Sequence, residues 1–247
     1  MNRVAAVIQS RMGSTRCPGK ALRPLAGAPM TEHIIKRAQQ VADFDRIVLA
    51  IPDSPSEQPL VELAHRMGID LFQGPEEDVL LRFILAGDAV NADHILRICG
   101  DNPLIDIPLT RDLVRYHLEK NADYTIPEGV IPVGTATEIV KVETLKHIAS
   151  ITTDPAHREH VITYFRDHPE SFHIERIPAP LYLRDKNLRL TLDTEQDFLL
   201  MEKIYEQFYD PHHLVVDLEQ ILSYLEAHPE WTRLNADVPQ KNWRLKK

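Results

Sequence analysis

A run of twelve residues near the start of the chain, QSRMGSTRCPGK, combines small, hydroxyl-bearing and basic side chains and directly follows an apolar stretch. Gly13 and Ser14 allow backbone N–H groups to approach a phosphate, and the cations Arg11, Arg16 and Lys20 add fixed positive charge. The GxxxxGK[ST] spacing of a P-loop is absent. The run therefore predicts a phosphate-binding loop of a different kind, with a solvated basic loop as the alternative.

Two later segments place a carboxylate at the end of an apolar stretch. Asp101 lies in GDNPLID, and Asp193 lies in LTLDTEQD. Carboxylates at such positions suit Mg²⁺, a hard cation that takes few protein ligands together with phosphate oxygens. For Asp101 a plain turn is an equal alternative. Asp197 has capping-box spacing from Thr194, which favours a structural role for Asp197 over a catalytic one.

Two arginines each allow two interpretations. Arg97 interrupts the apolar stretch ILRIC, where a charge must find a carboxylate or another anion. It therefore forms an internal salt bridge or contacts the nucleotide or substrate. Arg82 follows the acidic run EED. It pairs with one of those acids at helical spacing, or it touches the nucleotide or an acceptor carboxylate.

Apolar spacing predicts the elements that must position these residues. In the first half of the chain, strands alternate with helices. We expect strands at 4–9, 47–51, 71–73 and 95–99, and helices at 34–41, 60–67, 79–90 and 109–118. This alternation indicates a parallel sheet with right-handed crossovers. Ligands of such sheets bind beyond the carboxyl ends of the strands, where the two candidate segments of the first half lie.

The second half is less regular. We expect strands at 124–126, 138–141, 172–177 and 188–192, and helices at 142–151, 157–168, 194–208 and 218–227. We interpret residues 1–238 as one domain in which 124–187 form a small substrate or dimerisation lobe. Residues 239–247 would then be a loose tail.

Bulk composition excludes several classes of protein. The net charge of −9 argues against a general nucleic-acid binder, yet no acidic residue precedes Glu32, as suits a specific anion site. Two cysteines do not suggest a disulfide framework. We see no signal peptide and no stretch long enough to span a membrane. The histidines match no zinc pattern. We therefore expect a cytoplasmic protein.

The motifs, in order, resemble those of the CMP-sugar synthetases, the cytidylyltransferases of acylneuraminate and 3-deoxy-manno-octulosonate. The basic loop is similar to their N-terminal signature. The segments GDNPLID, REH (158–160) and LDTEQDF (192–198) most resemble later motifs of the spore-coat polysaccharide biosynthesis protein F group. The similarity extends to about residue 208. Two departures are Cys17, where leucine is expected, and the absence of an acid between Gly134 and Glu138.

The resemblance implies a nucleotide-diphospho-sugar-transferase-like, Rossmann-like α/β sandwich with a mostly parallel sheet, in a homodimer. It implies that Arg11, Ser14, Arg16 and Lys20 hold the phosphates of CTP and that Asp101 and Asp193 bind Mg²⁺. We assign catalytic roles to Arg11, Lys20 and Asp101. The implied reaction joins CMP to a sugar or sugar acid and releases pyrophosphate.

Two alternatives come from different classes. A sugar transferase that uses a ready-made nucleotide sugar would have a similar fold, but its usual Asp-x-Asp metal motif is not supplied by Asp101-Asn-Pro. A non-catalytic nucleotide-binding protein would not need both carboxylates. Cys17, within the basic loop, is expected to have a thiol pKa lowered by the neighbouring cations.

Overall fold

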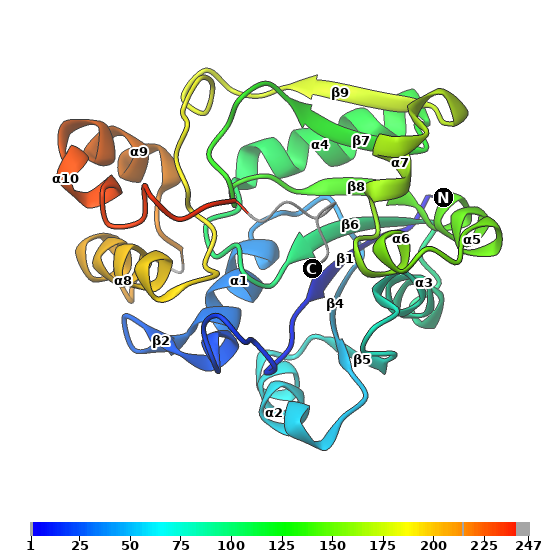
Figure 1. The fold of residues 1–247 in the computed structure, drawn as a ribbon, viewed down its shortest axis with the longest axis horizontal. Coiled ribbons are helices and arrows are strands. Elements are labelled where there is room, and N and C mark those ends of the chain that lie inside the picture. Colours follow the sequence, from blue (N-terminus) through cyan, green and yellow to red (C-terminus); the bar gives the residue numbers. More distant parts are fainter. Residues whose placement is uncertain (1, 214, 241–247) are drawn as a thin grey trace.

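The computed structural model describes residues 2–213 and 215–240. A seven-stranded sheet runs through the molecule in the order β5-β4-β1-β6-β8-β7-β9 (Figure 1). Its strands are β1 (Val4–Gln9), β4 (Arg46–Pro52), β5 (Asp70–Gly74), β6 (His94–Cys99), β7 (Tyr124–Glu128), β8 (Glu138–Lys141) and β9 (Ile174–Pro178). The α/β class and the mostly parallel sheet are confirmed.

The first half of the chain forms the parallel part of the sheet. Strand β1 lies between β4 and β6 and is parallel to both, and β5 extends the sheet beyond β4. The intervening helices are α1 (Met30–Gln39), α2 (Gln58–Met67), α3 (Val79–Ala89) and α4 (Ile107–Lys120). All four strands therefore end at the same edge, where the loops that follow them meet.

Side-chain alternation along β1 explains why helices cover both faces of the sheet. Ala5 and Val7 belong to a buried cluster with α3 and α5 (Val142–Ile151). Val4, Ala6 and Ile8 pack in another cluster with residues of α1, α2 and α4. A strand that is apolar at consecutive positions, as this one is, is typical of a parallel sheet that is buried on both faces.

The second half extends the same sheet. Strand β8 is antiparallel to both β6 and β7, and β9 runs parallel to β7. Residues 124–187 thus contribute three strands that continue from β6. Their helices are α5, α6 (Pro155–Glu159) and α7 (Thr163–Asp167). The boundaries proposed for a separate lobe stay a prediction. Of the proposed tail 239–247, residues 241–247 lie outside the described residues.

A third buried cluster lies among the C-terminal helices, which Figure 1 draws to the left of the sheet. It is built largely from α8 (Glu195–Phe208) and α9 (Leu218–Ala227), with α10 (Pro229–Thr232) packed against α9. A short hairpin of β2 (Pro24–Leu25) and β3 (Ala28–Pro29), which the sequence did not predict, contacts α8 through β2. No helix in the described part of the chain is long and apolar enough to cross a membrane.

Two predicted elements are wrong. Residues 157–168 form the two short helices α6 and α7 rather than one helix. Residues 188–192 form no strand. Arg189 makes an isolated bridge to Val133, and the N–H of Leu192 donates to the carbonyl of Asp101 at 2.8 Å. The segment is extended, but its partners are two loops rather than a strand, because it crosses the end of the sheet instead of joining its edge.

Candidate active site

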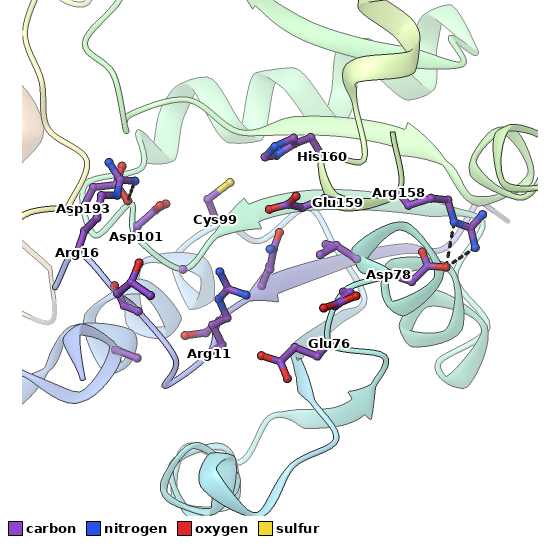
Figure 2. Close-up of a pocket in the computed structure, with 18 of the residues that line it drawn as sticks. Arg11, Arg16, Glu76, Asp78, Cys99, Asp101, Arg158, Glu159, His160 and Asp193 are labelled. Atoms are coloured by element: carbon purple, nitrogen blue, oxygen red, sulfur yellow. Dashed lines mark hydrogen bonds and ion pairs between the residues drawn. The ribbon is translucent and has the colours of Figure 1, made fainter. Parts of the chain in front are cut away.

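A cavity of about 880 Å³ opens beyond the carboxyl ends of β1, β5 and β6. Figure 2 shows Arg16, Asp101 and Asp193 at one end and Asp78 with Arg158 at the other. Cys99 and Glu159 lie between the two ends. A cavity of this size is in the range of small-molecule and cofactor sites.

The basic loop after β1 forms one wall. Arg11, Ser14, Arg16 and Lys20 line the cavity, whereas Gly13 does not. The N–H of Met12 donates to the buried carboxylate of Glu57 at 2.9 Å, which ties the loop to the segment before α2. The loop is therefore attached to the fold at a point between its cations rather than hanging free in solvent.

Gly19 lets the loop turn so that Lys20 enters the site. Its φ of +66° lies in the left-handed region, which glycine adopts without strain, and a short 3-10 helix, Lys20–Leu22, follows directly. Gly100 serves a different purpose. Its N–H donates to the carbonyl of Gln9 at 2.7 Å, and an added Cβ would lie 2.3 Å from that oxygen. The ends of β1 and β6 can approach this closely only with glycine at position 100.

Lys20 lies between the two carboxylates that the sequence singled out. Its Nζ is 3.1 Å from Oδ1 of Asp193 and 3.7 Å from Oδ2 of Asp101, and it donates to the carbonyl of Leu192 at 2.6 Å. Arg16 also contacts Oδ1 of Asp193, at 3.0 Å. The structure thus brings together four of the residues predicted from sequence.

The start of α8 holds Asp193 in position. Thr194 and Asp197 form the predicted capping box, and Oδ2 of Asp197 also accepts from the N–H of Asp193 at 3.0 Å. Arg189, which sequence reasoning missed, contacts Asp193 at 3.2 Å and Asp197 at 2.8 Å. Its four-residue spacing from Asp193 was a signal only for a helix, and the segment is not helical.

The two carboxylates differ in their protonation equilibria. Burial raises the pKa of Asp101, and repulsion from Asp193 adds to this, against the opposing effect of Lys20. Burial also disfavours the charged form of Asp193, but Lys20, Arg16 and Arg189 outweigh it and hold the pKa of Asp193 below its ordinary value. Asp193 is therefore the more firmly ionised of the two.

The donor set fits Mg²⁺. Asp101 and Asp193 supply carboxylate oxygens that already converge on one cationic group, the Lys20 ammonium. Within the described ranges, no three His, Cys, Asp or Glu side chains are grouped so that they would hold a metal ion. Mg²⁺ commonly binds through one or two carboxylates, water and substrate phosphates. Asp101 and Asp193 would be the protein ligands of such a site, and water and phosphate oxygens would complete the coordination.

Arg97 and Arg82 have different environments. Arg97 lines the cavity, and its Nη1 donates to Glu138 at 2.9 Å, so the internal salt bridge is present at the cavity itself. Arg82 is only 1% exposed and does not line the cavity. It donates to the carbonyls of Pro75 and Glu76 and so supports the loop after β5 from behind.

Cys17 corrects one expectation. Its side chain is fully buried, and burial raises the pKa of its thiol, so the prediction of a lowered pKa is wrong. Its Sγ lies 3.3 Å from Nη1 of Arg23 and 3.5 Å from Oε1 of Glu195. The residue packs the loop against α8. Cys99 does line the cavity, but burial raises its thiol pKa to about 11.

The far wall of the cavity joins two elements. Arg158, on α6, donates through Nε to Oδ2 of Asp78 at 2.9 Å, and Nη2 donates to the same oxygen (Figure 2). Asp78 is also the N-cap of α3, where Oδ1 accepts from the N–H of Leu81. Glu159 and His160, which follow Arg158, line the cavity as well. In the sequence, the resemblance of residues 158–160 to a family motif was the signal that pointed to this wall.

Comparison with known proteins gives a consistent result. A family model described as cytidylyltransferase matches residues 5–227 of the chain. The spore coat polysaccharide biosynthesis protein SpsF of Bacillus subtilis is 32% identical over 235 residues, which is 93% of this chain and 97% of that protein. The range matched by the family model includes the basic loop and both carboxylates.

Solved structures show the same fold. A cytidylyltransferase from Leptospira borgpetersenii superposes with a TM-score of 0.88 at 24% identity and covers 97% of this chain and 100% of that one. A CMP:2-keto-3-deoxy-manno-octonic acid synthetase solved with CTP superposes with a TM-score of 0.65 at 17% identity, over 83% of this chain and 99% of that chain.

Proposed function

The chain belongs to the cytidylyltransferase family, and we propose that it is a Mg²⁺-dependent enzyme that transfers CMP from CTP to a hydroxyl of a sugar or sugar acid, with release of pyrophosphate. The observation that supports this most directly is the convergence of Asp101, Asp193 and Lys20 at one end of the cavity, with Arg16 in contact with Asp193 and Arg11 on the wall of the same cavity. Metal-binding carboxylates next to several fixed cations suit a reaction that moves a phosphate-bearing group.

The reaction requires positioning and charge stabilisation more than covalent work by the protein. The acceptor oxygen bonds to the α-phosphorus, its proton leaves to solvent, and the bond from the α-phosphorus to pyrophosphate breaks. Arg11, Arg16 and Lys20 stabilise the charge that develops on the departing pyrophosphate. When bound, Mg²⁺ lowers the pKa of the attacking hydroxyl and offsets phosphate charge. Asp101 and Asp193 would hold it.

The relatives support the class of acceptor. SpsF is named for the biosynthesis of a spore-coat polysaccharide, and the synthetase of similar fold is named for a sugar acid. We therefore place the reaction in surface polysaccharide or glycan biosynthesis. We also expect a cytoplasmic homodimer, and sedimentation equilibrium of the purified chain tests the dimer.

The test is pyrophosphate release from each of the four NTPs, with and without Mg²⁺, against a panel of sugars, octulosonic acids and nonulosonic acids. We expect release with CTP and at least one acceptor, abolished by EDTA. Transfer from a ready-made nucleotide sugar, without release from any NTP, would instead identify a glycosyltransferase. CTP binding without turnover of any acceptor would identify a non-catalytic binding protein.

A further inference from the structure

The ammonium of Lys20 occupies the position where the two proposed metal ligands come together. It contacts Oδ1 of Asp193 at 3.1 Å and Oδ2 of Asp101 at 3.7 Å. The Lys20 side chain is only 13% exposed, and the carbonyl of Leu192 fixes it further at 2.6 Å. A lysine held by three oxygens from two separate segments is a specific arrangement rather than a solvated surface pair.

A divalent ion bound between Asp101 and Asp193 would compete with this ammonium for the same oxygens. Mg²⁺ approaches a carboxylate oxygen to about 2.1 Å, closer than the ammonium does, and the two cations would then repel each other across a few ångströms. The other oxygen of Asp193, Oδ2, is already bonded to Arg189. An ion that bridges Oδ1 of Asp193 and Oδ2 of Asp101 must therefore displace Lys20, and it shares Oδ1 with Arg16, which lies 3.0 Å away.

The cavity supplies a destination for the displaced lysine. Lys20 lines it together with Arg11, Ser14 and Arg16, the residues assigned to the triphosphate. Lysine has a flexible four-carbon stem and a compact charge, so a small change in its side-chain torsions moves the ammonium from carboxylates to phosphates. Arg189 lacks this freedom, because Asp197 holds it at 2.8 Å.

We infer that Lys20 is a displaceable counter-ion. Its ammonium blocks the metal site to free divalent ions, and it leaves the site when the phosphates of a bound nucleoside triphosphate attract it. The inference rests on the proposed function for the identity of that nucleotide. Its consequence is that metal and nucleotide bind cooperatively. Either one alone must break the contacts between Lys20 and the carboxylates, whereas together the phosphates pair with the ammonium and the metal pairs with the carboxylates. A metal ion without nucleotide must break the lysine contacts and leave the ammonium without an anion.

The test measures Mn²⁺ binding to the full-length protein, by electron paramagnetic resonance, in the absence of nucleotide. Lys20→Met removes the competing charge and keeps the length of the side chain. We expect it to tighten Mn²⁺ binding by at least about tenfold, as removal of a unit charge from beside the ion should. Addition of α,β-methylene CTP should tighten Mn²⁺ binding to the wild type much more than to Lys20→Met.

Lys36→Met is the matched control. Lys36 forms an ion pair with Glu32 at 2.9 Å on α1, outside the cavity lining, and its replacement changes the net charge equally. We expect Mn²⁺ binding close to that of the wild type. Asp193→Asn should weaken binding in the Lys20→Met background, which shows that the ion occupies the inferred site.

The inference is overturned if Lys20→Met binds Mn²⁺ no more tightly than the wild type, or if neither binds it in the millimolar range. If Lys20 were merely structural, Lys20→Met would lower the midpoint of thermal unfolding without changing the affinity for Mn²⁺. A melting curve separates these cases. Failure of the proposed function has a different signature. In that case Lys20→Met would still bind Mn²⁺ more tightly, while no NTP released pyrophosphate with any acceptor.

Discussion

The cationic residues in and around this site differ in which groups neutralise their charge. Arg11 is exposed on the cavity wall, whereas Arg82 is buried against backbone carbonyls. Arg97 is paired with Glu138, and Lys20 with two carboxylates. Residue type alone does not distinguish a cation that awaits a phosphate from one that supports a loop. The group that neutralises each cation indicates its role, since a buried charge without a neutralising partner carries a large cost in free energy.

At this scale the two carboxylates give a direct prediction. Asp101→Asn and Asp193→Asn each remove a charged metal ligand while keeping the side-chain shape. We expect each to lower the rate of pyrophosphate release at least about a hundredfold, the usual scale for loss of one electrostatic contact to a transition state. Rates at saturating CTP and Mg²⁺ provide the measurement.

The control for these variants is Asp43→Asn. Asp43 forms ion pairs with Arg111 and Arg115, outside the cavity lining, so its loss should leave the rate close to that of the wild type. Full metal-dependent activity in Asp193→Asn would contradict the assignment of this residue to the metal.

At the scale of elements, the N-terminus of α8 determines where Asp193 lies. The capping box of Thr194 and Asp197 begins the helix, and the same Asp197 carboxylate fixes the backbone of Asp193 and accepts from Arg189. One helix start therefore both ends the extended segment and aims its last carboxylate at Lys20. This is why a local capping signal has a consequence for the active site.

Thr194→Ala tests the helix start. Loss of the cap should reduce the free energy of unfolding by about 1 kcal/mol, because the N–H of Asp197 loses its side-chain acceptor. Urea denaturation of the two proteins measures the difference. Thr232→Ala is the comparison, since its hydroxyl donates to the carbonyl of Pro229 within the short helix α10 and its removal should change stability by less than about 0.5 kcal/mol. Equal effects of the two changes would argue against the capping role.

The ion pair between α6 and α3 gives a second prediction at this scale. Arg158→Met breaks the contact with Asp78 that joins the two sides of the far wall. Since Arg158 positions the wall but lies far from Asp101 and Asp193 (Figure 2), we expect KM for CTP or acceptor to rise about tenfold, with a smaller change in kcat.

Steady-state kinetics with each substrate varied in turn separates the two constants, and Arg158→Lys should recover part of the loss. Arg115→Met removes a comparable ion pair with Asp43, on an exposed side chain, and should leave both constants unchanged. A fall in kcat with an unchanged KM would show that Arg158 acts in the chemical step instead.

At the scale of the whole molecule, a buried polar chain joins the parallel half of the sheet to its extension. Nδ1 of His94, on β6, lies 3.0 Å from Nε2 of His117, on α4. Nδ1 of His117 lies 2.8 Å from the hydroxyl of Thr125, on β7. Burial, then repulsion from His94 and Lys141, lowers the pKa of His117 to about 3. The folded protein therefore keeps His117 neutral.

This shift makes stability depend on pH. Above the ordinary pKa of 6.5 both folded and unfolded chains hold His117 neutral, so it adds no pH dependence. As the pH falls from 6.5 toward 3, only the unfolded chain takes up the proton, and His117 alone lowers the free energy of unfolding by about 1 kcal/mol per pH unit.

Urea midpoints at pH 7.5, 6.0 and 5.0 measure the effect. His117→Gln keeps a hydrogen-bonding side chain but cannot titrate, so its stability should fall less steeply with decreasing pH than that of the wild type. Parallel profiles for the two proteins would contradict the assignment.

Features that depend on neighbours along the chain could be predicted from the sequence. The apolar periodicity from Val4 to Lys120 predicted strands and helices close to those observed, and because parallel strands end at one edge, it also predicted where the basic loop and Asp101 would meet. The Thr194 capping box was likewise readable, since its hydrogen bonds join residues three positions apart.

Contacts between distant segments could not be predicted in this way, because they form only when the chain folds. Lys20 and Asp193 are 173 positions apart, and no local pattern shows that the lysine lies on the carboxylates. Residues 188–192 have the composition of a strand, but they contact two loops instead of a neighbouring strand. Burial also reversed the expected shift of the Cys17 thiol. In each case the deciding energy comes from long-range packing and desolvation, which local sequence does not encode.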